Sequence, residues 1–167
     1  MQKAKQRSEI AQQDKWRIED IYATDEAWEA DYNECIRRAK EKCAYQGRLA
    51  ESAQILYQAL KESDEADLLV EHVYVYAFMK YYEDTANAVY QEMSGRAQAA
   101  VTKLSEKYAF LTPEILAIDQ KKMQEYLNSD TLALYRHALE DILAKKEHAL
   151  SEKEERLLAR AGDGFTE

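Results

Sequence analysis

The sequence predicts an all-α fold, and three observations support this prediction. The 167-residue chain contains only four glycines and one proline, too few turn-forming residues for a sheet protein with many connections. No glycine or proline interrupts the chain between Gly47 and Gly95. The stretch Leu68–Tyr82 is apolar or aromatic at all but three positions, and apolar runs of that length are usually helical. We therefore expect a bundle of about six to eight helices around a central helix near Leu68–Tyr82.

The first third of the chain predicts one helix after a polar start. Residues 1–15 are polar and are expected to be flexible. Large apolar side chains then cluster between Trp16 and Tyr22. Thr24 and Asp25 form an N-cap signal with acidic residues in the first turn, where the helix dipole favours them. A first helix is expected from about Glu26 to Ala44.

Three helices are predicted in the middle of the chain. One covers about residues 52–63 and is broken at Ser63–Asp64, which caps the central helix. The clearest pattern lies between Val89 and Leu111, where apolar residues recur every three or four positions. Gly95 inside this pattern costs about 1 kcal/mol relative to alanine. We expect close helix packing to explain why it is tolerated.

The last third predicts shorter helices. Thr112 and Pro113 signal the start of a helix over about 114–118, followed by one over about 120–127. Residues 128–130 start a longer helix to about Lys145. Ser151 and Glu154 match a capping box, which predicts a last helix to about residue 161. The predicted helical domain therefore spans residues 16–161 and is followed by a short linker at 162–167.

Charge and hydropathy exclude several function classes. The net charge of −9 argues against a nucleic-acid partner, because phosphate binding needs clustered Lys and Arg. The fifteen-residue apolar run is shorter than the roughly 20 residues that a bilayer requires, so no membrane partner is expected. The amino terminus lacks the apolar core of a secretory signal. We therefore expect a cytoplasmic protein.

The sequence offers no recognisable catalytic or metal-binding motif. His72 lies in the central helix and is expected at the core or its rim, while His148 sits near a helix end. His137 has Asp141 four residues on, which suits a simple pair on one helix face. His137 and His148 would stand roughly 16 Å apart along a continuous helix, too far to share a metal ion. We expect no catalytic residue, no metal ligand and no cofactor in this chain.

The two cysteines are expected to be free. Cys35 and Cys43 are eight residues apart on one predicted helix, roughly 12 Å along its axis. A disulfide needs Cα atoms within about 7 Å, so the two cannot bridge each other. Both are interpreted as packing residues, with a reactive thiol as the alternative.

The twelve tyrosines are the other unusual feature. Tyr74 and Tyr81 are seven residues apart on one helix face, with Tyr82 beside them. Tyrosine combines apolar area with a polar tip, which suits a hydrated peptide-binding wall. Core packing is the alternative, and the sequence leaves both open.

Several segments resemble, in the right order, one known peptidase family. They are KWRIEDIYATDEAW from Lys15, Tyr45-x-Gly47-x-Leu49, VYVYAFMKYYEDT from Val73, YQEMSGRAQ from Tyr90, FLTPEIL from Phe110 and YRHALEDILAKKEHALSEKEERLLA from Tyr135. Together they cover about residues 14–164. This ordered set resembles the N-terminal helical domain of the oligoendopeptidase F family, which consists of thimet-oligopeptidase-like zinc metallopeptidases.

The resemblance implies a function for the chain. It would be the non-catalytic N-terminal domain of a cytoplasmic zinc metalloendopeptidase that cleaves oligopeptides, forming part of the wall of the substrate channel. Tyr74, Tyr81 and Tyr82 are the candidate channel-wall residues. The chain alone would not be an enzyme, whereas the full-length parent would be. The alternative is a stand-alone helical binding or scaffold module with no enzymatic role.

The resemblance also implies partners. Zinc and its ligands are expected in a catalytic domain of the same polypeptide, with residues 162–167 as a truncated linker toward it. The other expected partner is an oligopeptide substrate. Since a surface built to pack on another domain leaves apolar area exposed, we expect the isolated chain to form a homo-oligomer.

Overall fold

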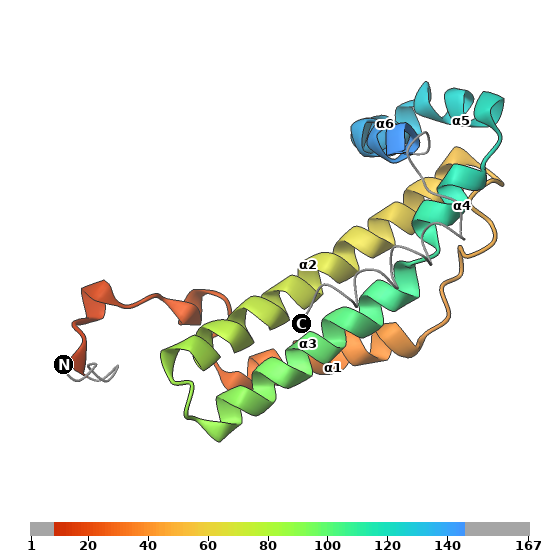
Figure 1. Ribbon diagram of the computed structural model, residues 1–167. Coiled ribbons are helices and arrows are strands. Elements are labelled where there is room, and N and C mark those ends of the chain that lie inside the picture. The colour runs from red at the N-terminus through yellow and green to blue at the C-terminus, as the bar shows by residue number, and fades with distance from the viewer. Residues whose placement is uncertain (1–8, 146–167) are drawn as a thin grey trace, which may run out of the picture. The chain divides into compact units, whose positions relative to one another are not determined.

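The computed structural model describes residues 9–145 and consists of helices and connecting loops in that range (Figure 1). The all-α class predicted from the sequence is therefore confirmed for the described residues. The α-helices are α1 (Asp25–Lys40), α2 (Ala53–Glu83), α3 (Ala88–Tyr108), α4 (Leu111–Ala117), α5 (Gln120–Leu127) and α6 (Arg136–Lys145). Short 3₁₀ helices occur at Gln12–Asp14, Ile18–Asp20 and Asp130–Tyr135.

The chain divides into two compact units. One contains residues 1–46 with 58–111, and the other contains 47–57 with 112–167. The predicted bundle of six to eight helices is not borne out in the described part. In the first unit α1, α3 and residues 58–83 of α2 pack together, whereas the short helices α5 and α6 belong to the second.

Helix α1 begins where the sequence predicts and ends earlier. The Thr24 hydroxyl caps it by accepting a hydrogen bond from the Ala27 amide. The helix stops at Lys40, four residues before the expected end, because Glu41 adopts an extended conformation (φ −76°, ψ 138°). In the loop that follows, Gly47 has a φ of +82°, a conformation that side-chain-bearing residues rarely adopt.

Helix α2 is continuous, so the predicted break at Ser63–Asp64 is wrong. Most of its buried positions recur in steps of three and four residues, at Leu56, Ala59, Ser63, Ala66, Val70, Val73 and Ala77, with Tyr76 also buried. Ser63 is small enough to remain within this stripe, so the apolar pattern carries the helix through the polar pair. The predicted central helix Leu68–Tyr82 is the second half of α2. No helix within residues 9–145 has the length and apolarity required of a bilayer span.

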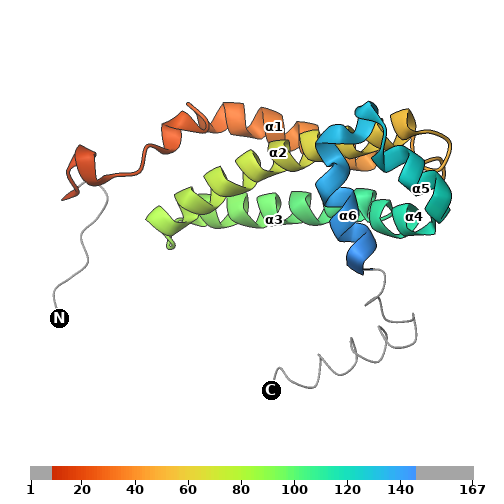
Figure 2. The same ribbon diagram turned by 90° about the horizontal axis from the view of Figure 1, so that it is seen from above.

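The three long helices of the first unit lie side by side, with α2 antiparallel to the other two (Figures 1 and 2). Trp28 of α1 is 1% exposed, and its indole Nε1 donates a hydrogen bond to the Val73 carbonyl of α2 at 2.8 Å. The Arg96 guanidinium of α3 lies 5.2 Å from the Trp28 ring centre and 4.2 Å from that of Tyr32. Arg96 also pairs with the Glu29 carboxylate. One buried tryptophan thus contacts elements of all three helices.

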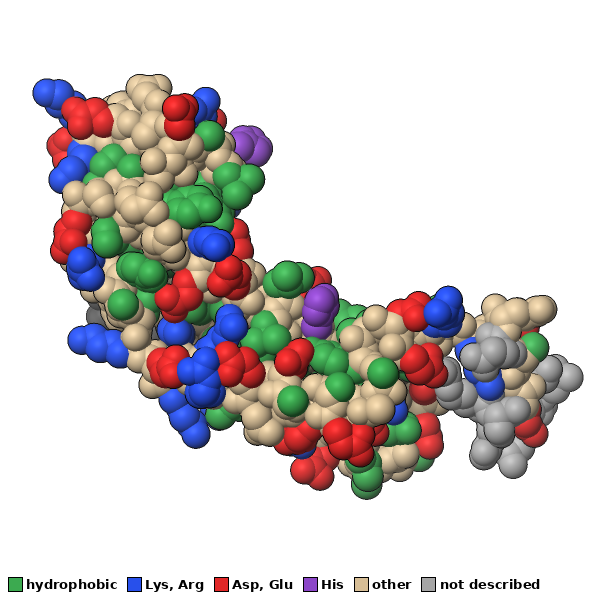
Figure 3. All heavy atoms as spheres, turned by 180° about the vertical axis from the view of Figure 1, so that it is seen from behind, with side chains coloured by type: hydrophobic (Ala, Val, Ile, Leu, Met, Phe, Trp, Pro, Cys, Tyr) green, Lys and Arg blue, Asp and Glu red, His purple; other side chains and the backbone are tan. Residues whose placement is uncertain are grey.

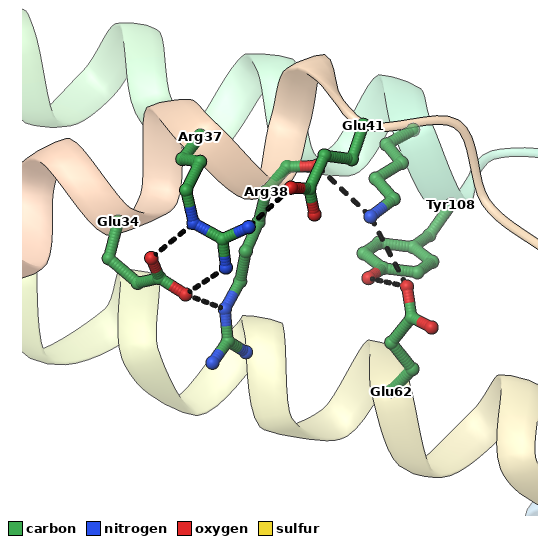
Figure 4. Close-up of polar contacts among 7 residues, drawn as sticks. Glu34, Arg37, Arg38, Glu41, Glu62 and Tyr108 are labelled. Atoms are coloured by element: carbon green, nitrogen blue, oxygen red, sulfur yellow. Dashed lines mark hydrogen bonds and ion pairs between the residues drawn. The ribbon is translucent and has the colours of Figure 1, made fainter.

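Polar contacts connect the same helices at the far end of α1 (Figure 4). Lys107 Nζ of α3 donates to the Arg38 carbonyl of α1 at 3.0 Å and lies 3.2 Å from the Glu62 carboxylate of α2. The Tyr108 hydroxyl donates to the same carboxylate at 2.9 Å. A nearly buried lysine therefore satisfies a carbonyl at the end of α1, where the helix dipole favours a cation.

Helix α3 follows most of the predicted pattern, but Val89, at its start, is exposed and not buried as predicted. Met93, Ala97, Ala100, Leu104 and Tyr108 are buried, as their spacing predicts. Close packing does not explain Gly95, since a Cβ atom built there would meet no heavy atom within 4 Å. The residue is exposed, so that interpretation is wrong.

In the second unit, Glu114 of α4 connects the loop before α2 to the short helices. The Glu114 carboxylate accepts hydrogen bonds from the backbone amides of Gly47 at 2.9 Å and Leu49 at 2.8 Å. The Tyr126 hydroxyl donates to the Ala50 carbonyl at 2.9 Å. These bonds hold residues 47–50 against α4 and α5. The fully buried Leu49 side chain then belongs to the core, with Leu56, Ile115, Met123, Leu132 and Leu139.

Helix boundaries in the second unit agree only partly with the sequence. α5 has the predicted bounds and is capped by Asp119, which accepts from the Lys121 and Lys122 amides. α4 begins three residues earlier than expected, with Pro113 in its first turn, where a missing N–H costs little. The predicted helix up to Lys145 is a 3₁₀ segment followed by α6. The predicted last helix and the linker lie outside the described residues.

Trp28→Phe is expected to destabilise the chain by about 2–4 kcal/mol, because it removes the Val73 hydrogen bond and leaves a cavity. Trp16→Phe is the matched control, since Trp16 is 67% exposed, and it should stay within about 0.5 kcal/mol of the native chain. Urea unfolding followed by circular dichroism measures both. Equal unfolding midpoints for the two variants would contradict the central role of Trp28.

Glu34 is expected to make stability depend on acid pH. Hydrogen bonds from Arg37 and Arg38 lower the pKa of its carboxyl from 4.5 to about 2 (Figure 4). The folded chain therefore binds a proton at Glu34 less readily than the unfolded chain does. The stabilisation that ionised Glu34 gives to the fold is complete above pH about 4.5 and is lost as pH falls towards 2. Glu34→Gln should flatten the rise in stability between these pH values. Identical acid-unfolding profiles for the native chain and Glu34→Gln would refute this role of Glu34.

Candidate functional site: the aromatic face of α2

The second half of α2 carries four aromatic side chains that are connected by ring contacts. The rings of Tyr74 and Phe78 stack with centres 4.2 Å apart, and those of Tyr81 and Tyr82 lie 5.4 Å apart. Phe78 contacts Tyr81 at 6.4 Å and Tyr82 at 6.0 Å. We call Tyr74, Phe78, Tyr81 and Tyr82 the aromatic face. Such contacts stabilise by about 0.5–1.5 kcal/mol each and restrain the rings.

The structure brings the three candidate tyrosines together through a residue that sequence reasoning missed. Tyr74 and Tyr81 are half-buried, whereas Tyr82 is 67% exposed. Phe78 lies between them, four residues from both Tyr74 and Tyr82, so its helical spacing was the available signal. Whether the tyrosines form a substrate wall stays a prediction.

The neighbouring turn of α2 carries a polar cluster that contacts α1. The Tyr76 hydroxyl donates to the Asp25 carboxylate at 2.7 Å, and Lys80 Nζ pairs with it at 2.9 Å. Burial and the bond to Asp25 raise the pKa of Tyr76 to about 12. Burial alone would raise the pKa of Asp25, but the bonds from Tyr76 and Lys80 lower it. Lys80 Nζ also lies 5.3 Å from the Tyr76 ring centre and 5.2 Å from that of Tyr90.

Two hollows of the first unit flank the end of α2. The larger, of about 560 Å³, is lined by residues that include Asp25, Lys80 and Tyr90. The smaller, of about 240 Å³, is lined by residues that include Trp16 and Tyr82. Figure 3 shows hydrophobic side chains interspersed with acidic and basic groups over one face of the molecule. The end of α2 therefore combines exposed aromatic rings, charge and concave surface.

The histidines do not form a metal site in the described part of the chain. His72 is exposed on α2, not in the core or at its rim as expected, because the buried stripe of the helix passes along another side. His137 Nε2 lies 3.7 Å from the Asp141 carboxylate, which confirms the predicted pair. His148 lies outside the described residues. Between residues 9 and 145, no three His, Cys, Asp or Glu side chains are grouped to hold a metal ion.

Both cysteines are buried and free. Cys35 lies in α1, but Cys43 lies beyond its end, so the prediction of a shared helix is wrong. Burial raises the pKa of the Cys35 thiol to about 11, which keeps it protonated and poorly nucleophilic at neutral pH.

Comparison with known proteins places the chain in a family. It is 40% identical over 158 residues to oligopeptidase PepF of Bacillus subtilis, an alignment covering 94% of this chain and 24% of the relative. An oligoendopeptidase F homolog of Lactococcus lactis is 39% identical over 168 residues, covering 97% and 27%. The family model described as oligopeptidase F matches residues 114–167. The chain belongs to the oligopeptidase F family. The family predicted from the sequence motifs is thus confirmed.

Solved structures agree with this assignment to the oligopeptidase F family. Oligoendopeptidase F of Enterococcus faecium matches with a TM-score of 0.69 and 31% identity, covering 84% of this chain and 27% of that one. A protein described as a peptidase, from Chlamydophila abortus, matches with a TM-score of 0.80 and 25% identity, covering 95% and 27%. The chain spans about a quarter of the length of these relatives and corresponds to their N-terminal part.

Neither cysteine is expected to react in the folded chain, because Cys35 is 0% and Cys43 is 5% exposed. A chromogenic disulfide reagent at pH 8 should release little colour within minutes from the native protein. In urea it should report two thiols, which serves as the internal control. Rapid stoichiometric reaction of the native chain would favour the reactive-thiol alternative.

Proposed function

We propose that this chain is the non-catalytic N-terminal part of a longer zinc-dependent endopeptidase, and that its aromatic face contributes to the surface along which an oligopeptide binds. The observation that carries this proposal is the length of its relatives. Proteins named as oligopeptidases match nearly the whole chain while extending to about four times its length. The catalytic part and the substrate peptide are the proposed partners, and the cytoplasm is the proposed location.

The donor groups of this chain support a non-catalytic role. A catalytic zinc site takes three protein ligands, usually from His, Glu, Asp or Cys, and activates a water molecule for attack. The described residues do not fit such a site, because no suitable group of these side chains occurs among them. We therefore assign no step of peptide-bond cleavage to this chain, and place the zinc ligands in the part of the protein beyond it.

The aromatic face supports a role in holding peptides. Its rings are restrained by contacts through Phe78, so little side-chain freedom would be lost when a peptide packs on them. Tyr82 exposes most of its ring, and tyrosine hydroxyls can bond to peptide backbone groups. A helical domain over residues 16–161 with a linker at 162–167 remains part of this proposal, as does self-association of the isolated chain.

Tyr81→Ala, made in the longer enzyme that contains this chain, is expected to raise KM for an oligopeptide about threefold to tenfold with little change in kcat. The reason is that contacts remote from the reacting bond are made equally in ground and transition states. Steady-state kinetics measures both constants.

Tyr57→Ala is the matched control, since Tyr57 packs against Tyr135 at 5.8 Å in the second unit. It should lower the melting temperature and leave KM unchanged. If Tyr81→Ala changed only the melting temperature, the aromatic face would be a packing surface and the proposal would fail.

A further inference from the structure

The two hollows at the end of α2 meet at one side chain. Glu83 lines both the smaller hollow, with Trp16, Met79 and Tyr82, and the larger one, with Lys80. All of these residues belong to the first unit. The two concave surfaces therefore form one composite site with two chemically different halves.

The smaller half has aromatic walls that face solvent, and its lining also includes the charged residues Asp14 and Lys15. Trp16 and Tyr82 are each 67% exposed, which places them among the most exposed large apolar side chains of the described residues. Met79 contributes a half-buried thioether, which adapts readily to the shape of an apolar partner. Two exposed rings beside a hollow are suited to receive an apolar or aromatic side chain, because its burial also removes their own surface from water.

The larger half carries an excess of negative charge. Its lining includes four carboxylates, from Glu19, Asp25, Glu83 and Asp84, and one cationic group, that of Lys80. Lys80 pairs with Asp25, and the lining as a whole carries more carboxylates than cationic groups. The Lys80 ammonium group is itself held in this hollow, by Asp25 and by contacts with the Tyr76 and Tyr90 rings.

We propose that this composite site binds a peptide through an apolar or aromatic side chain packed against Trp16 and Tyr82, and a neighbouring basic side chain received by the carboxylates of the larger hollow. The peptide nature of the ligand rests on the proposed function. The two side-chain classes follow from the hollows themselves. Residues that are adjacent or one apart in an extended peptide lie within about 7 Å of each other, which suits two halves that share a wall.

Tryptophan fluorescence of the 167-residue chain tests this directly. The chain has two tryptophans, and Trp28 is buried, so acrylamide quenching reports mainly on Trp16. The probe is a tetrapeptide, blocked at both ends, with phenylalanine followed by arginine at its centre. It is expected to protect Trp16 from acrylamide in a saturable manner. Matched peptides with glutamate in place of arginine, or alanine in place of phenylalanine, should bind at least about tenfold more weakly.

Single substitutions test the contribution of each half of the composite site to peptide binding. Tyr82→Ala should weaken binding of the phenylalanine–arginine peptide about fivefold or more, and Glu19→Gln about twofold to fivefold, since exposed charge pairs are weak. Glu26→Gln is the control for the charge, because Glu26 is an exposed acid of α1 that does not line the hollow. It should leave affinity unchanged. Circular dichroism confirms that each variant is folded.

Three results would overturn the inference. One is equal affinity for the arginine and glutamate peptides, and another is unchanged quenching of Trp16 at saturating peptide. The third is protection of Trp16 that grows with protein concentration in the absence of peptide, which would assign the hollow to a second copy of the chain. None of these affects the KM test at Tyr81, so failure of this inference is distinguishable from failure of the proposed function.

Discussion

The first unit depends on the burial of one polar aromatic side chain. An indole N–H buried without a partner costs about 1–3 kcal/mol, so Trp28 is tolerated at 1% exposure because its N–H donates a hydrogen bond to the Val73 carbonyl. That bond sets the position of α1 along α2. The Arg96 guanidinium covers the indole from α3 and is neutralised by Glu29, which sets the position of the third helix. The aromatic face and both hollows lie toward the end of α2, so their geometry follows from this arrangement.

The second unit depends on an interaction of another kind, a carboxylate that satisfies loop backbone. Glu114 accepts from the amides of Gly47 and Leu49, which are more than 60 residues away in the chain. The left-handed conformation of Gly47 belongs to the turn that presents these amides. Two of the short segments that carried the family resemblance, around Gly47 and around Glu114, are thus in direct contact. Together they secure Leu49 in the core.

Much of the helical fold could be predicted because capping and periodicity are local. Thr24 and the bounds of α5 are examples in which the deciding hydrogen bonds span two or three residues. The break at Ser63–Asp64 was predicted wrongly because polar propensity was given more weight than an uninterrupted buried stripe. The candidate site was only partly predictable. Tyr74, Tyr81 and Tyr82 could be selected by type and spacing, whereas Trp16 and Glu19 reach the same region only through the path of the chain before α1.

The sequence by itself determined the helical class, most helix starts and, through its ordered motifs, the oligopeptidase F family. These properties depend on residues within a few positions of one another and on residue identity. The tertiary structure alone decided which sides of the almost wholly apolar second half of α2 stay in contact with solvent. It placed His72 and Tyr82 outside and Val73 inside, and it joined an aromatic hollow to an acidic one at Glu83. Burial there is set by partners distant in sequence, because Leu68–Tyr82 is too uniformly apolar for a local pattern to choose between its faces.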